Sequence, residues 1–315
     1  MRATVISGPG SVALEAVATP SPGPGEVLVE IEGCGVCGSD LPVWEGRPWF
    51  EYPREPGAPG HEGWGRVAAL GDGVRGLEVG RRGAAVAYRS DAEYDVAPAA
   101  SVVALPDALE DVPFPGEPLG CAMNVARRAG LREGQTVAVI GTGFLGALLV
   151  QLAARAGARV IAISRRPFAL GVARRMGAEQ ALALDGDTQA RVEELTGGAL
   201  CDRVIEVAGK QASLDLAGAL TRVRGRLVIA GFHQDGPRQV DMRLWNWRGL
   251  DVINAHERDP AMYVRGVREA AEAVATGRLD PAPLYTHRFP LARIGEAFAT
   301  AGERPDGFLK ALVHP

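Results

Sequence analysis

The stretch Thr136–Gly146, TVAVIGTGFLG, decides the fold. Its first five residues are mostly apolar and β-branched, which predicts a buried strand. Gly141, Gly143 and Gly146 follow with G-x-G-x-x-G spacing, and the next eleven residues, ALLVQLAARAG, carry apolar side chains at helical spacing. A strand, a glycine-rich turn and a helix in this order predict a dinucleotide-binding site. The alternative is an ordinary glycine-rich turn between a strand and a helix.

Each glycine has its own expected role. Gly141 permits the tight turn, Gly143 lets the backbone approach a pyrophosphate, and Gly146 lets the helix pack closely on the strand. The first helical residues, Phe144 and Leu145, present unpaired N–H groups and the positive end of the helix dipole to the phosphates. We therefore assign all five residues to cofactor binding.

Length and composition set limits on the protein class. The chain has 315 residues, enough for two domains, and a net charge of −4, which predicts neither a nucleic-acid partner nor attraction to a membrane. Four cysteines do not make a disulfide framework in a chain of this size. The N-terminus lacks an apolar signal segment, and no run of 18 apolar residues occurs. These features predict a cytoplasmic protein.

The pattern of elements changes twice along the chain. Residues 1–116 contain short apolar runs separated by Pro/Gly-rich turns, which predict a β-rich domain. Residues 117–255 alternate between strand and helix patterns, which predict a doubly wound parallel sheet of the Rossmann type. We expect residues 256–315 to return to the first domain. The predicted fold class is therefore α/β, with a Rossmann domain inserted in a β-rich domain.

The first domain contains potential metal ligands. Cys37 lies in GVCGSD, and His61 and Glu62 lie in PGHEGWG. Cysteine, histidine and glutamate are zinc ligand types, and two short glycine-flanked loops are able to meet in space. Considered alone, a single cysteine and a single histidine are more often a buried thiol and a structural imidazole.

Several motifs occur in an order that resembles the medium-chain, zinc-dependent alcohol and polyol dehydrogenases. The similarity extends over essentially the whole chain. The motifs are PGPGEVLVEIEGCGVCGSD, GAPGHEGWGRV, AEYDVAPAASVVALPD, EPLGCAMNVARRAGLREGQTVAVIGTGFLG, DRVIEVAG, GRLVIAGF and FLKALV.

The resemblance implies a GroES-like catalytic domain with one catalytic zinc ion per chain. Within it, Cys37 and His61 match zinc ligands, and Glu62 either ligates directly or stands next to the metal. Glu117 matches a carboxylate near the zinc of polyol dehydrogenases. Asp40 resembles the carboxylate that orients the zinc-binding histidine.

The sequence departs from the family in two places. The region AVAYRSDAEYDVAP contains no cysteine, so we expect no structural zinc. The position of the family's relay histidine is Pro42, which cannot carry a proton. Ser39 remains as a hydroxyl relay, with a water held by Glu62 or Glu117 as a further route for the proton.

Cys34 and Cys37 form a C-x-x-C motif. A redox dithiol is one interpretation, but the usual thioredoxin-like context is missing, so we favour a structural Cys34. Cys121 is interpreted as a core residue and a distant alternative ligand. His233 follows the GRLVIAGF motif, near the expected nicotinamide, and a structural role is predicted for it.

The end of the second strand of the Rossmann domain indicates the cofactor. NAD enzymes usually carry an acidic residue there, which holds the ribose hydroxyls. Here Ser164 is followed by Arg165 and Arg166, two guanidinium groups that suit a 2′-phosphate. We expect NADP(H) rather than NAD; the alternative is that both arginines are merely solvated.

The resemblance adds four more residues to the cofactor site. Ala208, Gly231 and Phe232 lie in or at the ends of DRVIEVAG and GRLVIAGF. Lys310, in FLKALV, matches a basic position that contacts the cofactor pyrophosphate in the family.

The combined prediction is a zinc-dependent oxidoreductase of the alcohol dehydrogenase type (EC 1.1.1.-). It transfers a hydride between NADP(H) and a small-molecule alcohol or ketone, such as a polyol, a sugar-like alcohol or a secondary metabolite. Trp44, Trp49 and Phe50 either wall the substrate pocket or simply pack. One alternative is a zinc-free NADPH-dependent reductase of alkenes or imines, and another is a non-catalytic NADP(H)-binding protein.

The segment LDVINA at residues 250–255 is expected to form an edge of the Rossmann sheet. In similar enzymes this edge pairs with a second subunit. We therefore predict a homodimer or a homotetramer.

Overall fold

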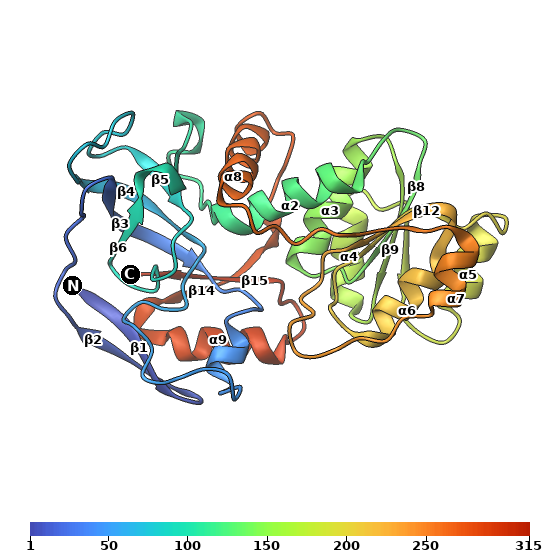
Figure 1. The fold of residues 1–315 in the computed structure, drawn as a ribbon, viewed down its shortest axis with the longest axis horizontal. Coiled ribbons are helices and arrows are strands. Elements are labelled where there is room, and N and C mark those ends of the chain that lie inside the picture. The colour runs from blue at the N-terminus through green and yellow to red at the C-terminus, as the bar shows by residue number, and fades with distance from the viewer. The chain divides into compact units, whose positions relative to one another are not determined.

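The computed structural model describes residues 1–315, which form two compact units. Unit 1 comprises Met1–Gly120 and Arg258–Pro315, and unit 2 comprises Cys121–Glu257. In Figure 1, most of unit 1 is blue, cyan and red, and most of unit 2 is green, yellow and orange. Helix α2 (Gly116–Ala129) begins in unit 1 and ends in unit 2.

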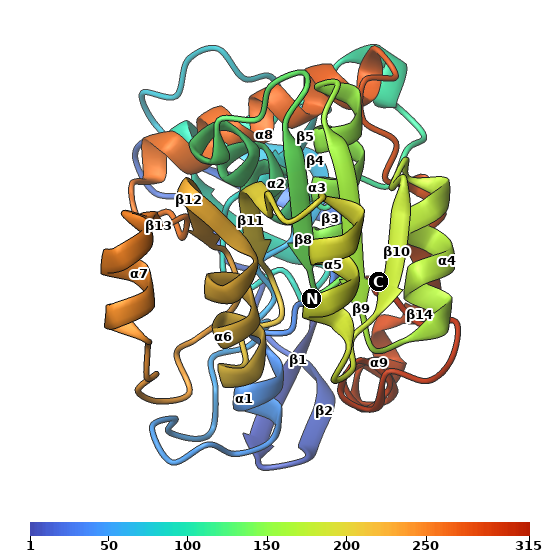
Figure 2. The same cartoon turned by 90° about the vertical axis from the view of Figure 1, so that its right-hand side faces the viewer.

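Unit 2 contains a six-stranded, fully parallel sheet with the order β10-β9-β8-β11-β12-β13 (Figure 2). The order reverses between β8 and β11, which is the topological switch point of a doubly wound sheet. The edge position of β13 confirms the prediction for residues 250–255. The strands are β8 (Thr136–Ile140), β9 (Arg159–Ser164), β10 (Gln180–Ala183), β11 (Cys201–Glu206), β12 (Thr221–Ile229) and β13 (Asp251–Asn254).

Helices cover this sheet in two groups. Helix α3 packs against α4, while α6 packs against both α5 and α7. The four apolar residues Val137–Ile140 of β8 are fully buried although successive side chains point to opposite faces, so both faces of the sheet are covered. The helices are α3 (Phe144–Arg155), α4 (Pro167–Arg175), α5 (Thr188–Leu195), α6 (Gln211–Leu220) and α7 (Met242–Arg248). The predicted α/β fold class is confirmed.

Unit 1 is built on a mostly antiparallel sheet with the order β14-β15-β3-β4-β5-β7, and β6 also pairs with β3. Strands β1 and β2 form a separate hairpin. Residues after 258 return to this sheet, where β15 pairs with β3. The strands are β1 (Arg2–Gly8), β2 (Ser11–Ala16), β3 (Glu26–Gly35), β4 (Gly63–Leu70), β5 (Arg82–Ala85), β6 (Tyr94–Pro98), β7 (Val102–Ala104), β14 (Tyr285–Pro290) and β15 (Lys310–His314).

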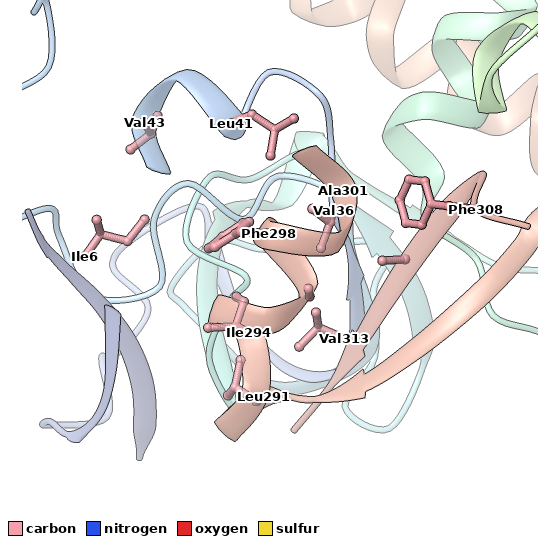
Figure 3. Close-up of a cluster of buried hydrophobic side chains, with 12 residues drawn as sticks. Ile6, Val36, Leu41, Val43, Leu291, Ile294, Phe298, Ala301, Phe308 and Val313 are labelled. Carbon is pink, nitrogen blue, oxygen red and sulfur yellow. The ribbon is translucent and has the colours of Figure 1, made fainter. Parts of the chain in front are cut away.

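Helix α9 (Ile294–Glu303) closes the core of unit 1. It buries Ile294, Ala297, Phe298 and Ala301, whose spacing places them on one helix face. This face packs among Ile6, Val36, Leu41 and Val313, among others (Figure 3). The cluster anchors the short helix α1 (Leu41–Trp44), which follows the Cys37 loop. The other helical segments are α8 (Pro260–Ala275) and four 3₁₀ turns at 99–101, 107–109, 282–284 and 291–293.

None of the helices has the length and apolar character needed to cross a membrane.

Candidate functional site

The glycine-rich turn of unit 2 has the backbone geometry expected from its spacing. Gly141 has a φ of +95°, and a Cβ atom there would lie 2.9 Å from the amide nitrogen of Ala208. A Cβ atom on Gly146 would lie 1.9 Å from the carbonyl oxygen of Gly141, so only glycine lets α3 approach β8 this closely. Gly143 is the N-cap of α3 and has open space around its Cα. This open position is where a phosphate group would approach the backbone.

The other expected cofactor residues of unit 2 lie at the same edge of the sheet, where the parallel strands end. Ser164 ends β9 and is 7% exposed, Arg165 is exposed, and Arg166 is the N-cap of α4. Ala208 follows β11, and Gly231 and Phe232 follow β12. In open α/β sheets, ligands bind outside the carboxyl ends of the strands at the switch point.

In unit 1, three expected metal ligands converge. The ligand atoms of Cys37, His61 and Glu62 all lie within 4.8 Å of one another. The sheet explains this convergence: Cys34 at the end of β3 pairs with Gly63 at the start of β4, so the loop after β3 meets the loop before β4. A thiolate, an imidazole and a carboxylate at this separation are a suitable donor set for zinc.

Asp40 holds two of these ligands in place. Its Oδ2 accepts a hydrogen bond from the Cys37 amide at 2.8 Å, and its Oδ1 lies 3.1 Å from His61 Nδ1. Nδ1 also lies 3.0 Å from the Pro59 carbonyl oxygen, which leaves Nε2 as the nitrogen available to a metal ion. Burial alone lowers the pKa of His61, but Asp40 and Cys37 raise it well above its usual value. A buried carboxylate behind the imidazole is the arrangement found around zinc-bound histidines.

Ser39 lies next to the metal ligands. Its hydroxyl donates a hydrogen bond to Cys37 Sγ at 3.2 Å. Pro42 lies in the first turn of α1, so no imidazole is present at that position. Ser39 therefore places a hydroxyl group beside the predicted ligand Cys37.

Lys310, which the resemblance places at the cofactor, lies beside Glu62. Its Nζ is buried in unit 1, lies 2.6 Å from Glu62 Oε1 and donates to the Val36 carbonyl oxygen at 2.9 Å. Burial alone lowers the pKa of Lys310, but Glu62 raises it above its usual value. In this structure Lys310 therefore forms a buried ion pair with one of the predicted metal ligands.

Other predicted residues lie apart from the cluster. Glu117 is the second residue of α2 and is not among the three mutually close ligands. Trp44 packs on Phe298 with ring centroids 5.5 Å apart, so it is part of the core of unit 1. Trp49 is 53% exposed. Burial raises the pKa of Cys34 well above its usual value, which keeps it a thiol and supports a structural role.

The sequence analysis missed several buried carboxyl groups, among them Asp91 and Glu206. Asp91 is 2% exposed, and burial raises its pKa well above the usual value. Glu206 ends β11, is fully buried and accepts several hydrogen bonds. A charged residue inside the otherwise apolar run VIEVA was the available signal for Glu206.

Two family models match this chain, and known proteins resemble it over most of its length. Residues 23–107 match the model of the alcohol dehydrogenase GroES-like domain, and residues 145–272 match that of the zinc-binding dehydrogenases. Human sorbitol dehydrogenase is 30% identical over 94% of this chain and 91% of its own length. The 2-dehydro-3-deoxy-L-galactonate 5-dehydrogenase of Pseudoalteromonas atlantica is 28% identical over 93% and 92%.

A solved structure of a proposed zinc-binding dehydrogenase from Sinorhizobium meliloti, bound to NADP, is 27% identical. It superposes with a TM-score of 0.85 and covers 100% of this chain and 99% of its own.

Proposed function

Because the chain belongs to the zinc-dependent medium-chain dehydrogenase/reductase superfamily and is an alcohol-dehydrogenase-like oxidoreductase, we propose a specific activity for it. It transfers a hydride between NADP(H) and an alcohol or ketone, with one catalytic zinc ion and no structural zinc. The observation that carries this proposal is the convergence of Cys37, His61 and Glu62 within 4.8 Å.

Zinc, when bound by these residues, supplies a Lewis acid that polarises the substrate oxygen. The chain itself does the positioning. Asp40 fixes the ring of His61 and the backbone of Cys37, so both donors face the same point. The Ser39 hydroxyl holds and passes the proton that an alcohol loses on oxidation, since the side chain of Pro42 has no group that carries a proton. Glu62 either completes the ligand set or stays paired with Lys310 next to the metal.

The cofactor supplies the hydride chemistry, and unit 2 supplies its binding site. The open backbone at Gly143 and the first turn of α3 accept the pyrophosphate. Arg165 and Arg166 follow β9 where a carboxylate would hold the ribose of NAD, which supports NADP(H). The NADP-bound relative is consistent with this preference.

The substrate is proposed to be a polyol, a sugar acid or a related alcohol. Relatives of this chain are a sorbitol dehydrogenase and a galactonate-type dehydrogenase, both named for polyhydroxylated substrates. Such substrates place a secondary alcohol beside further hydroxyl groups.

The metal content of the native protein tests the proposal. We expect about one zinc ion per chain after purification without chelator. We also expect NADP⁺-dependent oxidation of a polyol panel that stops on chelation. A metal-free native protein that reduces activated alkenes or imines with NADPH would contradict the proposal in favour of the zinc-free alternative. Tight NADPH binding without any turnover would identify the non-catalytic alternative.

We further propose a homodimer or homotetramer assembled through the free edge of β13. The neighbouring helix α7 exposes Trp247 at 86% and Met242 at 59%, large apolar side chains that a monomer rarely leaves in water. Replacing Trp247 with Glu is expected to shift the mass measured by light scattering to that of a monomer. A native protein that is already monomeric at micromolar concentration would contradict this assembly.

A further inference from the structure

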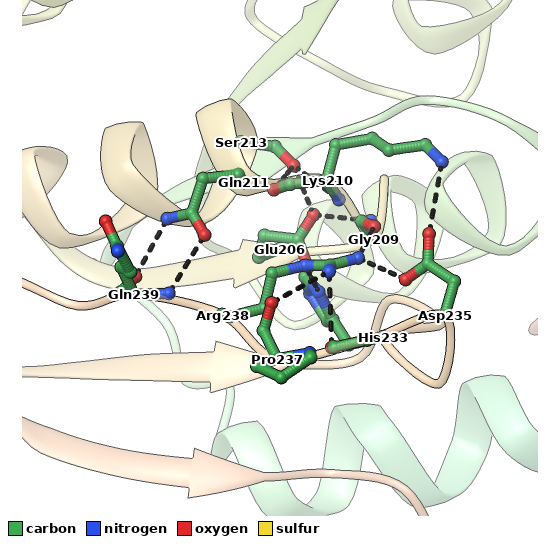
Figure 4. A network of polar contacts seen from close by, with 11 residues as sticks. Glu206, Gly209, Lys210, Gln211, Ser213, His233, Asp235, Pro237, Arg238 and Gln239 are labelled. Carbon is green, nitrogen blue, oxygen red and sulfur yellow. Dashed lines mark hydrogen bonds and ion pairs between the residues drawn. The ribbon is translucent and has the colours of Figure 1, made fainter.

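Glu206 lies at the carboxyl end of β11 and is fully buried. Its Oε1 accepts hydrogen bonds from the amides of Ala208 and Gly209 at 2.8 and 2.7 Å and from the Ser213 hydroxyl at 2.7 Å. Its Oε2 lies 2.8 Å from Nε2 of His233, and Figure 4 shows the two residues within the polar network. Four donors therefore compensate the buried carboxylate, and three of them belong to the turn between β11 and α6 and to α6 itself.

His233 links this carboxylate to the loop after β12. Its Nδ1 lies 3.0 Å from Nε of Arg238, and a guanidinium group only donates. Nδ1 is therefore the acceptor nitrogen, and Nε2 carries the proton that is donated to Glu206. Arg238 also donates to the Gly209 carbonyl oxygen at 3.2 Å and pairs with Asp235. The contacts Glu206–His233–Arg238, which we call the loop lock, close the β12–α7 loop onto the β11–α6 turn.

The backbones of these two segments are in close contact. A Cβ atom on Gly231 would lie 2.4 Å from the amide nitrogen of Gly209 and 2.6 Å from Glu206 Oε2. A Cβ atom on Gly209, whose φ is +69°, would lie 2.3 Å from the Phe232 carbonyl oxygen. The loop lock therefore holds Gly231 and Phe232 in one position beside the turn that follows β11.

The position of the loop lock at the end of the sheet indicates which half of the cofactor lies beside it. The sheet order β9-β8-β11-β12 puts the ends of β9 and β12 on opposite sides of the switch point. A dinucleotide that crosses the switch point with its 2′-phosphate at Arg165 and Arg166 must place its nicotinamide half on the β11–β12 side. Gly231 and Phe232 then border that half.

We propose that His233 is a positioning residue for the nicotinamide half of the cofactor, an inference that rests on the NADP(H) dependence proposed above. It acts through Glu206 and Arg238 and fixes the Gly231–Phe232 segment against which the nicotinamide half binds. Since binding energy from this half depends on a fixed loop, loss of the loop lock weakens binding of the whole dinucleotide but not of its adenosine half.

Fluorescence and calorimetric titrations with two probes test the proposal. NADPH reports on both halves, and 2′,5′-ADP reports on the adenosine half alone. His233→Leu removes the donor and the acceptor together and is expected to raise the Kd for NADPH about tenfold while the Kd for 2′,5′-ADP stays within about twofold. His233→Gln is expected to restore the wild-type values, because a side-chain amide also offers one donor and one acceptor about 2.2 Å apart.

Two further variants act as controls. Arg238→Met removes only the outer contact, and it is expected to raise the Kd for NADPH about threefold. His287→Leu makes the same exchange at a half-buried histidine of unit 1 that bonds to Thr286, and it is expected to change neither Kd.

The outcomes separate this proposal from the proposed function. Unchanged NADPH binding in a folded His233→Leu protein would overturn the role of His233 and leave NADP(H) dependence intact. Equal weakening of NADPH and 2′,5′-ADP would also overturn it, because the loop lock would then support the whole unit. A wild-type protein that binds neither probe would overturn NADP(H) dependence and the inference with it.

Discussion

The predicted dinucleotide site of unit 2, which we call the crevice, and the proposed metal site of unit 1, which we call the metal cluster, are built in different ways. The crevice begins with one contiguous motif, in which Gly141, Gly143 and Gly146 lie within six residues, from the turn after β8 to the first turn of α3. The metal cluster instead depends on the pairing of β3 with β4, which brings Cys37 to His61. The geometry of a contiguous motif is set by residues that are neighbours in the sequence, whereas the metal cluster exists only when the sheet has formed.

The two regions also differ in their buried charge. The glycine-rich turn is shaped by backbone contacts and needs no charged side chain of its own. The metal cluster buries the carboxyl groups of Asp40 and Glu62 and the ammonium group of Lys310. Buried charges cost free energy unless they are paired, so the metal cluster should respond more strongly to the loss of one partner.

The largest effect is expected from Cys37→Ala. It removes the thiolate ligand, so zinc should be lost and turnover of a polyol should fall by about 10³-fold or more, which corresponds to several kcal/mol of lost stabilisation. NADPH binding, measured by fluorescence, should not change, because the glycine-rich turn belongs to unit 2 and Cys37 belongs to unit 1.

Cys34→Ala is the matched control, since Cys34 is a buried thiol 3.6 Å from the Gly35 carbonyl oxygen in the same C-x-x-C motif. It should keep its zinc and its turnover. Equal loss of metal in both variants would show that the motif acts as a unit and would contradict the structural role of Cys34.

The next effect is expected from Lys310→Met. This change leaves Glu62 buried without its ammonium partner, and breaking a buried ion pair in this way costs about 3–5 kcal/mol of unfolding free energy. Denaturant titration of the metal-free protein measures the loss. The double variant with Glu62→Gln should recover part of it, because the buried carboxylate is then gone.

Lys310→Met also tests the interpretation taken from the family resemblance. Unchanged stability together with weaker NADPH binding would support the cofactor contact and contradict a stabilising role of the ion pair between Lys310 and Glu62.

Two glycine substitutions should separate folding from binding within the crevice. Gly146→Ala places a methyl group against the Gly141 carbonyl oxygen, and the forced shift should cost about 1–3 kcal/mol of unfolding free energy. Gly143→Ala meets no atom within 4 Å, so stability should hold while the Kd for NADPH rises. Equal melting temperatures for the two variants would contradict the close approach of α3 to β8.

The sequence predicted the crevice more completely than the metal cluster. Local spacing was sufficient for Gly141 and Gly146, because a turn and a helix–strand contact involve neighbouring residues. Cys37, His61 and Glu62 were identified by residue type together with the family resemblance, and the structure shows that they meet. The roles of Lys310 and Trp44 could not be read from spacing, since their partners Glu62 and Phe298 lie about 250 residues away.

The loop lock was missed for the same reason. Glu206 and His233 are separated by 27 residues and meet only because β11 and β12 are adjacent parallel strands. A pattern that reports one strand or one helix does not report such cross-strand contacts.

The smallest effect is expected at Asp202, at the opposite ends of the strands that form the crevice. Its carboxylate accepts hydrogen bonds from the Thr136 amide at 2.8 Å and from Arg222 at 2.7 Å, and so ties β8 to β12. Burial alone would raise the pKa of Asp202, but these donors lower it below its ordinary value of 3.8. A lowered carboxyl pKa in the folded state stabilises the protein above the ordinary value, and this stability is lost as the pH falls through the folded value.

Asp202→Asn should therefore cost about 1 kcal/mol of unfolding free energy at pH 7, and the difference from wild type should shrink as the pH falls below about 4. Asp107→Asn is the control, because its side chain is 92% exposed and its ion pair with Arg81 should contribute little. Thermal melts of the three proteins between pH 7 and pH 3 measure both effects. A difference that persists unchanged at pH 3 would show that Asp202 stabilises the sheet through its shape rather than its charge.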